Sequence, residues 1–351
     1  MTTAPQEAEN PLLNITDLID YAAVRPEHVM PAVKKLAADL EKALARATAP
    51  ETPATWDAVV VPLEEASLAF SRSWGAIGHL QSVVDTPALR DAFNEALPLA
   101  TDLYLRISQD EALYTKYLGI EKSDAFKALS PVRQRIIRRE IRDFELSGAA
   151  LPKEKRDRVK AIGQELSLLS QKFGENLLDA TNAFELVLPD ESRLAGVPAE
   201  TIALYRASAK AAGKTGLRLT LQFPSYLPAM KYCADRGIRE ALYYAFSTRA
   251  AEFDDGKYDN TPIIRRILEL RREEAELLGF KNFGELSLAT KMAKDPAEVL
   301  AFLRDLAKRS RPRALEDAGE VDDFAKKTLG IDEVEPWDRP YAAEKLREAR
   351  Y

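Results

Sequence analysis

The feature that most constrains the fold of this chain is a helical period that runs through residues 152–182. Apolar side chains recur there every three or four positions; they are Val159, Ile162, Leu166, Leu169, Phe173, Leu177 and Ala180. No proline follows Pro152 in this stretch, so we expect the longest helix of the chain here, about 45 Å long at ~1.5 Å per residue. A helix of this length is expected to connect several layers of a mainly α-helical protein.

The same period returns along most of the sequence. We expect further helices at 26–46, 55–84, 88–107, 110–118, 131–147, 198–212, 224–235, 238–251 and 260–278. Pro98 should break or kink the third of them. Only residues 184–189 and 217–223 alternate apolar and polar side chains, which predicts two short strands in a small antiparallel sheet. The chain should therefore be more than half α-helix, with under about a tenth strand.

The helix expected at 260–278 has a broad apolar arc. One face carries Ile264, Ile267, Leu268, Ala275 and Leu278, and a neighbouring stripe carries Ile263, Leu270 and Leu277. Arg271 and Glu274 fall inside the arc, so they should be ion-paired or should face water. Gly279 ends this helix, and the chain then enters another helix that contains Leu286 and Leu288. An arc this wide needs partners on two sides.

Composition excludes several classes of protein. The 351 residues carry 50 Lys+Arg against 56 Asp+Glu, a net charge of −6, so nucleic acid and anionic membranes are disfavoured as partners. Cys233 is the single cysteine, which excludes an internal disulfide and favours simple packing. The first ten residues carry no secretory signal and no run reaches the ~20 apolar residues of a membrane span. The cytoplasm is the expected compartment.

No active site can be assembled from the residues themselves. The two histidines, His28 and His79, fall on different expected helices, and the sequence has neither H-E-x-x-H nor G-x-S-x-G. We interpret both as ordinary surface or packing side chains. The run AAGKTG lacks the first glycine of a phosphate-binding loop, and it follows a helix rather than a strand, so residues 213–216 should form a turn. We therefore predict no catalytic residue and no metal ligand, and the sequence leaves the substrate-binding residues unknown.

Charged runs along the chain indicate solvated helix faces. The adjacent acidic residues Asp254 and Asp255, Asp322 and Asp323, and Glu273 and Glu274 should serve mainly solubility. Five arginines at 133, 135, 138, 139 and 142 are interleaved with acidic residues, without an aromatic stacking platform in the same run. A salt-bridged surface is favoured over a nucleic-acid interface there, and equally for Lys308, Arg309, Arg311 and Arg313.

Several stretches carry a family resemblance. The run LLGFKNFGELSLATKMAKDPAEVLAFLRDLAKRSRP, the later EPWDRPYAAEKLREARY, and NPLL and RPEHVMPAVKKL near the start closely resemble the thimet oligopeptidase family of zinc metallopeptidases. The resemblance implies a mainly α, neurolysin-like enzyme of two lobes around a deep channel that admits short unstructured peptides. In that family the zinc ligands lie downstream of the segment that matches EPWDRPYAAEKLREARY, so no catalytic or zinc-binding position is carried over to this chain.

The resemblance also predicts an organisation. We expect a disordered lead at 1–12, an N-terminal helical region at 13–150, a long helix with a small β element at 151–260, and a helical segment at 261–351 that is truncated before the catalytic region. This chain would form one channel wall and would be inactive alone, with zinc held by the missing C-terminal catalytic lobe. The alternative is a complete, non-enzymatic helical scaffold that binds peptides along a groove, although no internal repeat of 30 to 50 residues supports it.

Overall fold

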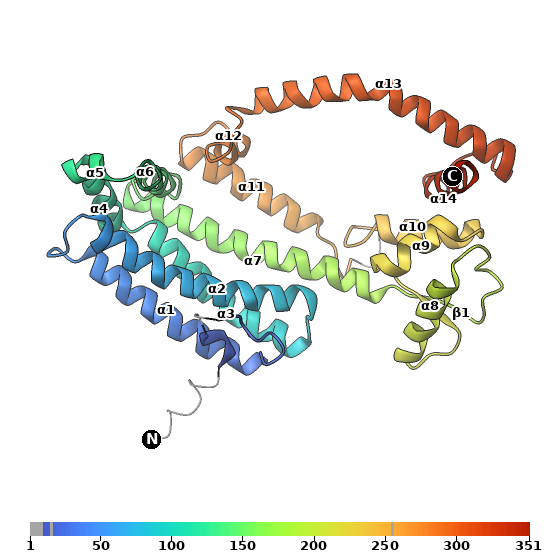
Figure 1. The fold of residues 1–351 in the computed structure, drawn as a ribbon, viewed down its shortest axis with the longest axis horizontal. Helices are drawn as coiled ribbons and strands as arrows, with labels where there is room; N and C mark the ends of the chain where they lie inside the picture. The colour runs from blue at the N-terminus through green and yellow to red at the C-terminus, as the bar shows by residue number, and fades with distance from the viewer. Residues whose placement is uncertain (1–9, 15–16, 254–255) are drawn as a thin grey trace. The chain divides into compact units, whose positions relative to one another are not determined.

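The computed structural model describes residues 10–14, 17–253 and 256–351 (Figure 1). The lead expected at 1–12 lies outside the described residues as far as residue 9, and Leu12, near its end, is buried. The described elements are η1 (Pro11–Leu13), α1 (Pro26–Thr48), η2 (Trp56–Val60), α2 (Val61–Val83), α3 (Pro87–Ser108), α4 (Glu111–Lys122), α5 (Asp124–Ala128), α6 (Pro131–Leu146), α7 (Lys153–Ala183), β1 (Leu186–Leu188), α8 (Ala199–Ala211), β2 (Leu217–Leu219), α9 (Phe223–Tyr232), α10 (Arg236–Ser247), α11 (Thr261–Leu277), α12 (Phe283–Leu288), α13 (Pro296–Leu329) and α14 (Arg339–Arg350).

The prediction of a mainly α-helical chain is confirmed, with 72% of the described residues helical. The two expected strands pair antiparallel with Leu186 opposite Leu219, although each spans only three residues. One helix prediction is wrong, because the longest described helix is α13, with 34 residues against 31 in α7. Of the break or kink expected at Pro98, the structure has no break, since α3 includes that residue. Helix α13 also contains a proline, Pro312, and continues past it.

The chain divides into two compact units. Unit 1 comprises residues 1–168 and 270–286, and unit 2 comprises 169–269 and 287–351. In unit 1, α1 packs against α2 and α3, and α4 packs against α6. Side chains from these helices form its core, where Trp74 stacks on Phe93 with ring centroids 4.9 Å apart. Helix α6 begins as expected, because the Ser130 hydroxyl accepts a hydrogen bond from the backbone N–H of Arg133.

Unit 2 has its core around the small sheet and helices α8, α9 and α10. Leu217 and Leu219 of β2 are buried while Arg218 between them is not, which is the alternation that predicted the strand. The turn before β2 contains Gly213 and Gly216, as expected from the sequence. Gly216 has φ +85°, and a β-carbon there would lie 2.2 Å from the carbonyl oxygen of Leu188. Only glycine fits this position.

A buried ion pair joins distant segments of unit 2. Asp338, just before α14, is fully buried and accepts hydrogen bonds from Arg239 at 2.7 Å and from Arg236 at 2.8 Å. Arg239 is itself only 1% exposed and also donates to the carbonyl of Cys233 at 2.7 Å. Glu344 of α14 accepts from the hydroxyl of Tyr232 at 3.1 Å. The Tyr232–Glu344 contact joins α9 to α14, and the buried Arg239–Asp338 pair joins α10 to the residue just before α14.

Candidate functional site

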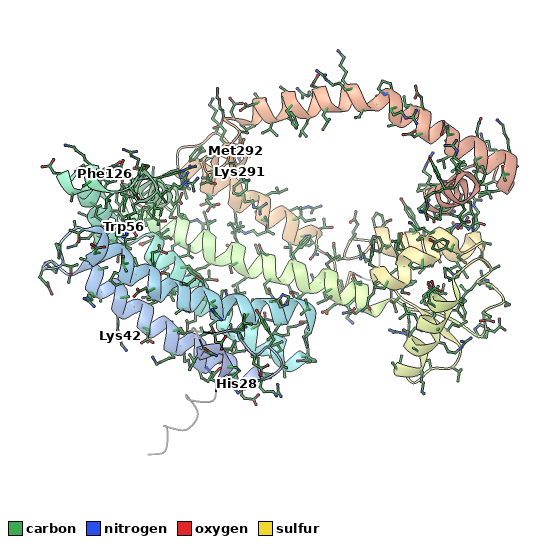
Figure 2. All side chains as sticks on the ribbon, in the orientation of Figure 1. His28, Lys42, Trp56, Phe126, Lys291 and Met292 are labelled. Carbon is green, nitrogen blue, oxygen red and sulfur yellow. The ribbon has the colours of Figure 1, made fainter. Side chains whose placement is uncertain are left out.

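The two histidines, His28 and His79, have separate local roles in unit 1. His28 lies in the first turn of α1, where its Nδ1 accepts a hydrogen bond from the backbone N–H of Arg25 at 3.1 Å (Figure 2). His79 lies exposed on α2 and meets the ring of Tyr21 edge-on, with centroids 5.7 Å apart. His28 acts as a capping residue, and His79 lies at the surface.

The described residues do not form a zinc site. No group of three or more His, Cys, Asp or Glu side chains in the described part of the chain is placed to hold a metal ion. A catalytic zinc needs three protein ligands and an open position, and the Nδ1 of His28 is already engaged in its helix cap. The zinc that the family resemblance implies does not fit these residues, and no reaction step is derived through it.

Cys233 packs in the core of unit 2. Its side chain is fully buried, and its Sγ lies 3.5 Å from the carbonyl oxygen of Arg193. Burial raises the pKa of the thiol above its ordinary value, so the thiolate is disfavoured at neutral pH. The interpretation of Cys233 as a packing residue is confirmed.

The paired acidic residues lie in ordinary surface contacts. Asp322 pairs with Arg339 at 3.0 Å, and Asp323 pairs with Lys327 at 2.8 Å. Glu273 accepts two hydrogen bonds from the Arg158 guanidinium, each 2.6 Å long. Asp254 and Asp255 lie outside the described residues. None of the described pairs forms two converging carboxylates.

The apolar arc of α11 is only partly covered. Leu270 and Ala275 are fully buried, whereas Ile264 and Leu268 of the expected main face are 45% and 60% exposed. The main face of the arc is therefore uncovered at those two residues in the described structure. Half-buried Arg271 places its guanidinium 4.8 Å from the ring centroid of Phe283. Burial raises the pKa of nearby Glu274, and the positive charge of Arg271 partly opposes that shift.

The basic runs are salt-bridged in part and stacked in part. On α6, Arg142 pairs with Asp143 at 2.7 Å. Arg133 lies over the ring of Trp56, with 5.0 Å between guanidinium and centroid, and Arg138 lies over Phe126 at 5.2 Å (Figure 2). These rings come from other segments, which the composition of the run itself does not reveal. On α13, Arg309 and Arg313 pair with acidic residues one turn away: Asp305, Glu316 and Asp317.

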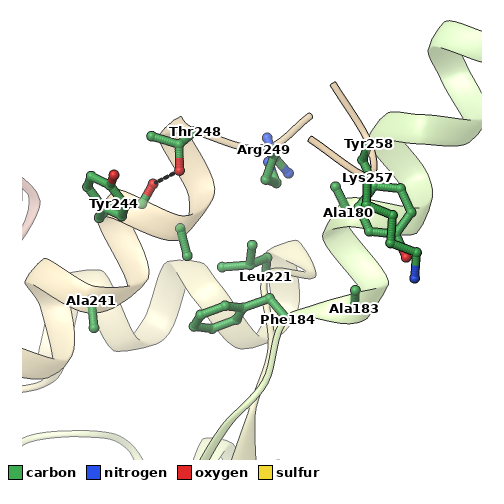
Figure 3. A pocket seen from close by; sticks show the side chains of 11 residues that line it. Ala180, Ala183, Phe184, Leu221, Ala241, Tyr244, Thr248, Arg249, Lys257 and Tyr258 are labelled. Carbon is green, nitrogen blue, oxygen red and sulfur yellow. Dashed lines mark hydrogen bonds between the residues drawn. The ribbon is translucent and has the colours of Figure 1, made fainter. Parts of the chain in front are cut away.

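Unit 2 contains a cavity of about 630 Å³ (Figure 3). It lies where the end of α7, helix α10 and the segment before α11 meet the residues that flank the two strands. The lining residues are Ala180, Ala183, Phe184, Leu221, Ala241, Tyr244, Ala245, Thr248, Arg249, Lys257 and Tyr258. Most of the lining is apolar, and two of these residues carry a positive charge. This is the composition of a site for a small organic anion with an apolar part.

No pattern in the sequence predicts this cavity. Its apolar wall includes Phe184 and Leu221, and one of its two cations is Arg249. These residues are separated by tens of positions and lie in different segments. No spacing in the sequence marks their convergence. The one local signal is Arg249 itself, a charged residue directly after the strongly amphipathic helix α10.

Comparison with known protein families identifies two consecutive matches. Residues 33–156 match "Neurolysin/Thimet oligopeptidase, N-terminal domain", and residues 229–351 match "Peptidase family M3". The first region lies within unit 1 and includes α2 to α6. The second includes α10 to α14, and with them the buried Arg239–Asp338 pair.

Curated relatives match almost the whole chain. Oligopeptidase A of Salmonella typhimurium is 42% identical over 344 residues, which are 97% of this chain and 51% of that protein. Oligopeptidase A of Escherichia coli is 41% identical over the same shares. The probable cytosolic oligopeptidase A of Arabidopsis thaliana is 38% identical over 98% of this chain and 50% of that protein. The chain thus spans about half the length of these relatives.

The family matches lie on a chain whose described part is mainly helical. The two family matches occur in order along a mainly helical chain with a small antiparallel sheet. None of the described helices is both long enough and apolar enough to cross a membrane. Over the length that it spans, the chain is a homologue of oligopeptidase A, and it carries regions that match the thimet oligopeptidase N-terminal domain and peptidase family M3.

Proposed function

We propose that this chain is the N-terminal part of a zinc-dependent oligopeptidase that resembles oligopeptidase A. The observation that carries the proposal is the 42% identity that extends over 97% of the chain and covers half of the relative. In the whole enzyme, a catalytic lobe of the same protein would hold zinc and hydrolyse short unstructured peptides in a deep channel. This chain would supply one wall of that channel in the cytoplasm.

In this proposal, the role of the chain is to bind and position the peptide substrate. Peptide hydrolysis by a zinc enzyme needs the metal-activated water and a carboxylate base beside it. The described residues offer no metal cluster, so this part contributes binding surface rather than the nucleophile. Exposed apolar side chains on α11 and α13 support the proposal, because such faces are suited to cover further polypeptide.

Complementation tests this proposal. The 351-residue chain is co-expressed with the C-terminal half of the same gene product, which is expected to carry H-E-x-x-H, and cleavage of a short fluorogenic peptide is measured. We expect cleavage that a chelator abolishes and that zinc restores. The matched control replaces the Glu of H-E-x-x-H in the C-terminal half by Gln, which removes the general base and leaves assembly intact.

Two results would contradict the proposal. Stoichiometric tight zinc and peptidase activity in the purified 351-residue chain alone would mean that it holds its own metal centre. An inactive mixture in which the two halves form a stable complex would favour the non-enzymatic scaffold, which binds peptides without cleaving them.

A further inference from the structure

The cavity in unit 2 combines an apolar wall with two cationic side chains, Arg249 and Lys257. Phe184 and Leu221 lie on one side of it, and Arg249 lies across the opening from them (Figure 3). Its volume of about 630 Å³ falls within the range of pockets that enclose small organic ligands. A ligand here must therefore place apolar atoms against Phe184 and Leu221 and a negatively charged group near Arg249.

The guanidinium of Arg249 is fixed before any ligand arrives. Its Nε donates to the carbonyl of Phe246 at 2.8 Å, and its Nη1 donates to the hydroxyl of Thr181 at 3.3 Å. Its plane lies 3.6 Å from the ring centroid of Phe246, which stacks in turn on Tyr226 at 4.2 Å. Rigid groups lose little conformational entropy when they bind.

The remaining donors of Arg249 suit a carboxylate. A guanidinium has five N–H donors, and among the described residues no hydrogen-bond acceptor is found for Nη2. That leaves Nη2 and the second N–H of Nη1, a pair of parallel donors that matches the two oxygens of a carboxylate. Burial lowers the pKa of Arg249, and a bound anion would offset that cost. None of the described residues that line the cavity is acidic.

Thr248 adds an acceptor beside this cation. Its Oγ1 donates its proton to the carbonyl of Tyr244 at 2.8 Å (Figure 3). The lone pairs of Oγ1 are then available to accept an N–H from a ligand. A fatty acid carries a carboxylate and an apolar part but no N–H, whereas the last residue of a peptide carries all three around one α-carbon.

We propose that this cavity binds the C-terminal residue of a peptide, with its α-carboxylate on Arg249 and an apolar side chain against Phe184 and Leu221. The inference rests on the proposed function only for the source of the ligand, which is a short peptide. It assigns a binding role to residues of this chain itself, and it concerns a free carboxyl terminus rather than the bond that is cleaved.

Fluorescence anisotropy tests the assignment with the 351-residue chain. The probes are two fluorescein-labelled pentapeptides of four glycines and a final leucine, one with a free carboxylate and one with a C-terminal amide. We expect the free acid to bind at least tenfold more tightly than the amide. Arg249→Gln should remove that preference, because the amide side chain cannot make the charged bidentate contact.

Two further variants separate binding from folding. Ala241→Trp places a large ring at the cavity from an exposed position of α10 and should abolish binding of the free acid while circular dichroism stays unchanged. Arg206→Gln is the charge-matched control, since Arg206 lies exposed on α8 and does not line this cavity. That variant should keep the full preference for the free acid.

Three outcomes would overturn the assignment: equal binding of acid and amide, equal effects of Arg249→Gln and Arg206→Gln, or no measurable binding of either peptide. Zinc-dependent cleavage after complementation reports separately on the proposed function. An active complemented enzyme whose 351-residue chain lacks the acid preference would retain the proposed function and remove this site. If the 351-residue chain prefers the free acid but the complemented enzyme cleaves no peptide, this site is retained and the proposed function is removed.

Discussion

At the scale of single residues, Asp338 is the carboxylate on which unit 2 most depends. It is fully buried, and two arginines from α10 donate hydrogen bonds to it. Desolvation opposes its ionisation, but the hydrogen bonds from Arg236 and Arg239 outweigh that effect and lower the pKa of the carboxyl. A carboxyl whose pKa is depressed by folding stabilises the protein above its unfolded pKa, and that contribution is lost as the pH falls through the folded value.

Asp338→Asn should therefore destabilise unit 2. Arg239 is 1% exposed and would be left without its carboxylate, so we expect a loss of ~3 kcal/mol in the free energy of unfolding at pH 7. Hydrogen exchange in α9 and α14 should accelerate, and the difference from wild type should shrink in acid. Asp323→Asn is the control, because an exposed ion pair such as the one that Asp323 makes with Lys327 contributes little to stability. A comparable loss in both variants would contradict this account.

Glu140 on α6 presents the opposite case. Burial, and then the negative charge of Glu64, raises the pKa of its carboxyl. At pH 7 the folded protein holds this carboxylate at a cost, so Glu140→Gln should raise the free energy of unfolding. The gain should diminish as the pH falls through the raised folded pKa, and it should be absent below the unfolded pKa, where both states are protonated. Urea titrations at several pH values measure it, with Glu51→Gln as a control at an exposed position.

At the scale of elements, the turn before β2 gives a matched pair of glycines. Gly216→Ala should cost more than ~1 kcal/mol, because φ is positive and the new methyl would meet the carbonyl oxygen of Leu188. Gly213→Ala shares a positive φ but has no atom within 4 Å of the new methyl, so it should cost only ~1 kcal/mol of backbone strain. Thermal unfolding compares the two. Equal losses would show that the clash at Gly216 relaxes freely.

Sequence reasoning worked where an element carries its own signal. Ser130 marks a helix start by its hydroxyl, and the alternation around Arg218 marks a strand. It failed where a neighbour decides the outcome. The longest helix was expected at 152–182, yet α13 is longer than α7. The wheel of α11 shows that the arc is broad, but it does not say that Leu270 is covered while Leu268 is exposed.

The candidate site was less predictable than the fold. The role of Cys233 as a packing residue followed from its context, because no histidine lies near it in sequence. The cavity could not be found in the same way, since Phe184, Leu221 and Arg249 come together only through the packing of unit 2. Convergence of distant residues is a tertiary property that a single sequence does not display.

At the scale of the whole molecule, the exposed apolar side chains of α13 affect the solubility and self-association of the chain. Phe302, Leu303 and Leu306 are each at least half exposed in the described structure, and Met292, in the segment before α13, is fully exposed (Figure 2). An exposed apolar stripe of this kind favours association or a partner. The chain alone should therefore be poorly soluble.

The double substitution Phe302→Ser with Leu306→Ser should reduce self-association without lowering the melting temperature, because neither side chain is buried. Light scattering over a concentration series measures the first effect, and calorimetry measures the second. In the complementation assay the same variant should lose cleavage at low protein concentration. Arg309→Ser with Arg313→Ser changes α13 without altering its apolar stripe and should leave self-association as it was. A large fall in melting temperature in the Phe302 and Leu306 variant would show that the stripe is already packed.

The Arg239–Asp338 pair can form only late in the synthesis of unit 2. The two residues are 99 positions apart, and α9, which α14 covers, precedes both. At about 5–20 residues per second, a ribosome takes roughly 5 to 20 s to make the chain between them. For that interval Arg239 has no carboxylate from Asp338, and the nascent α9 has no α14 against it. Helix α14 therefore packs against α9 late in synthesis. During those seconds α9 is accessible to a chaperone that binds exposed apolar helices.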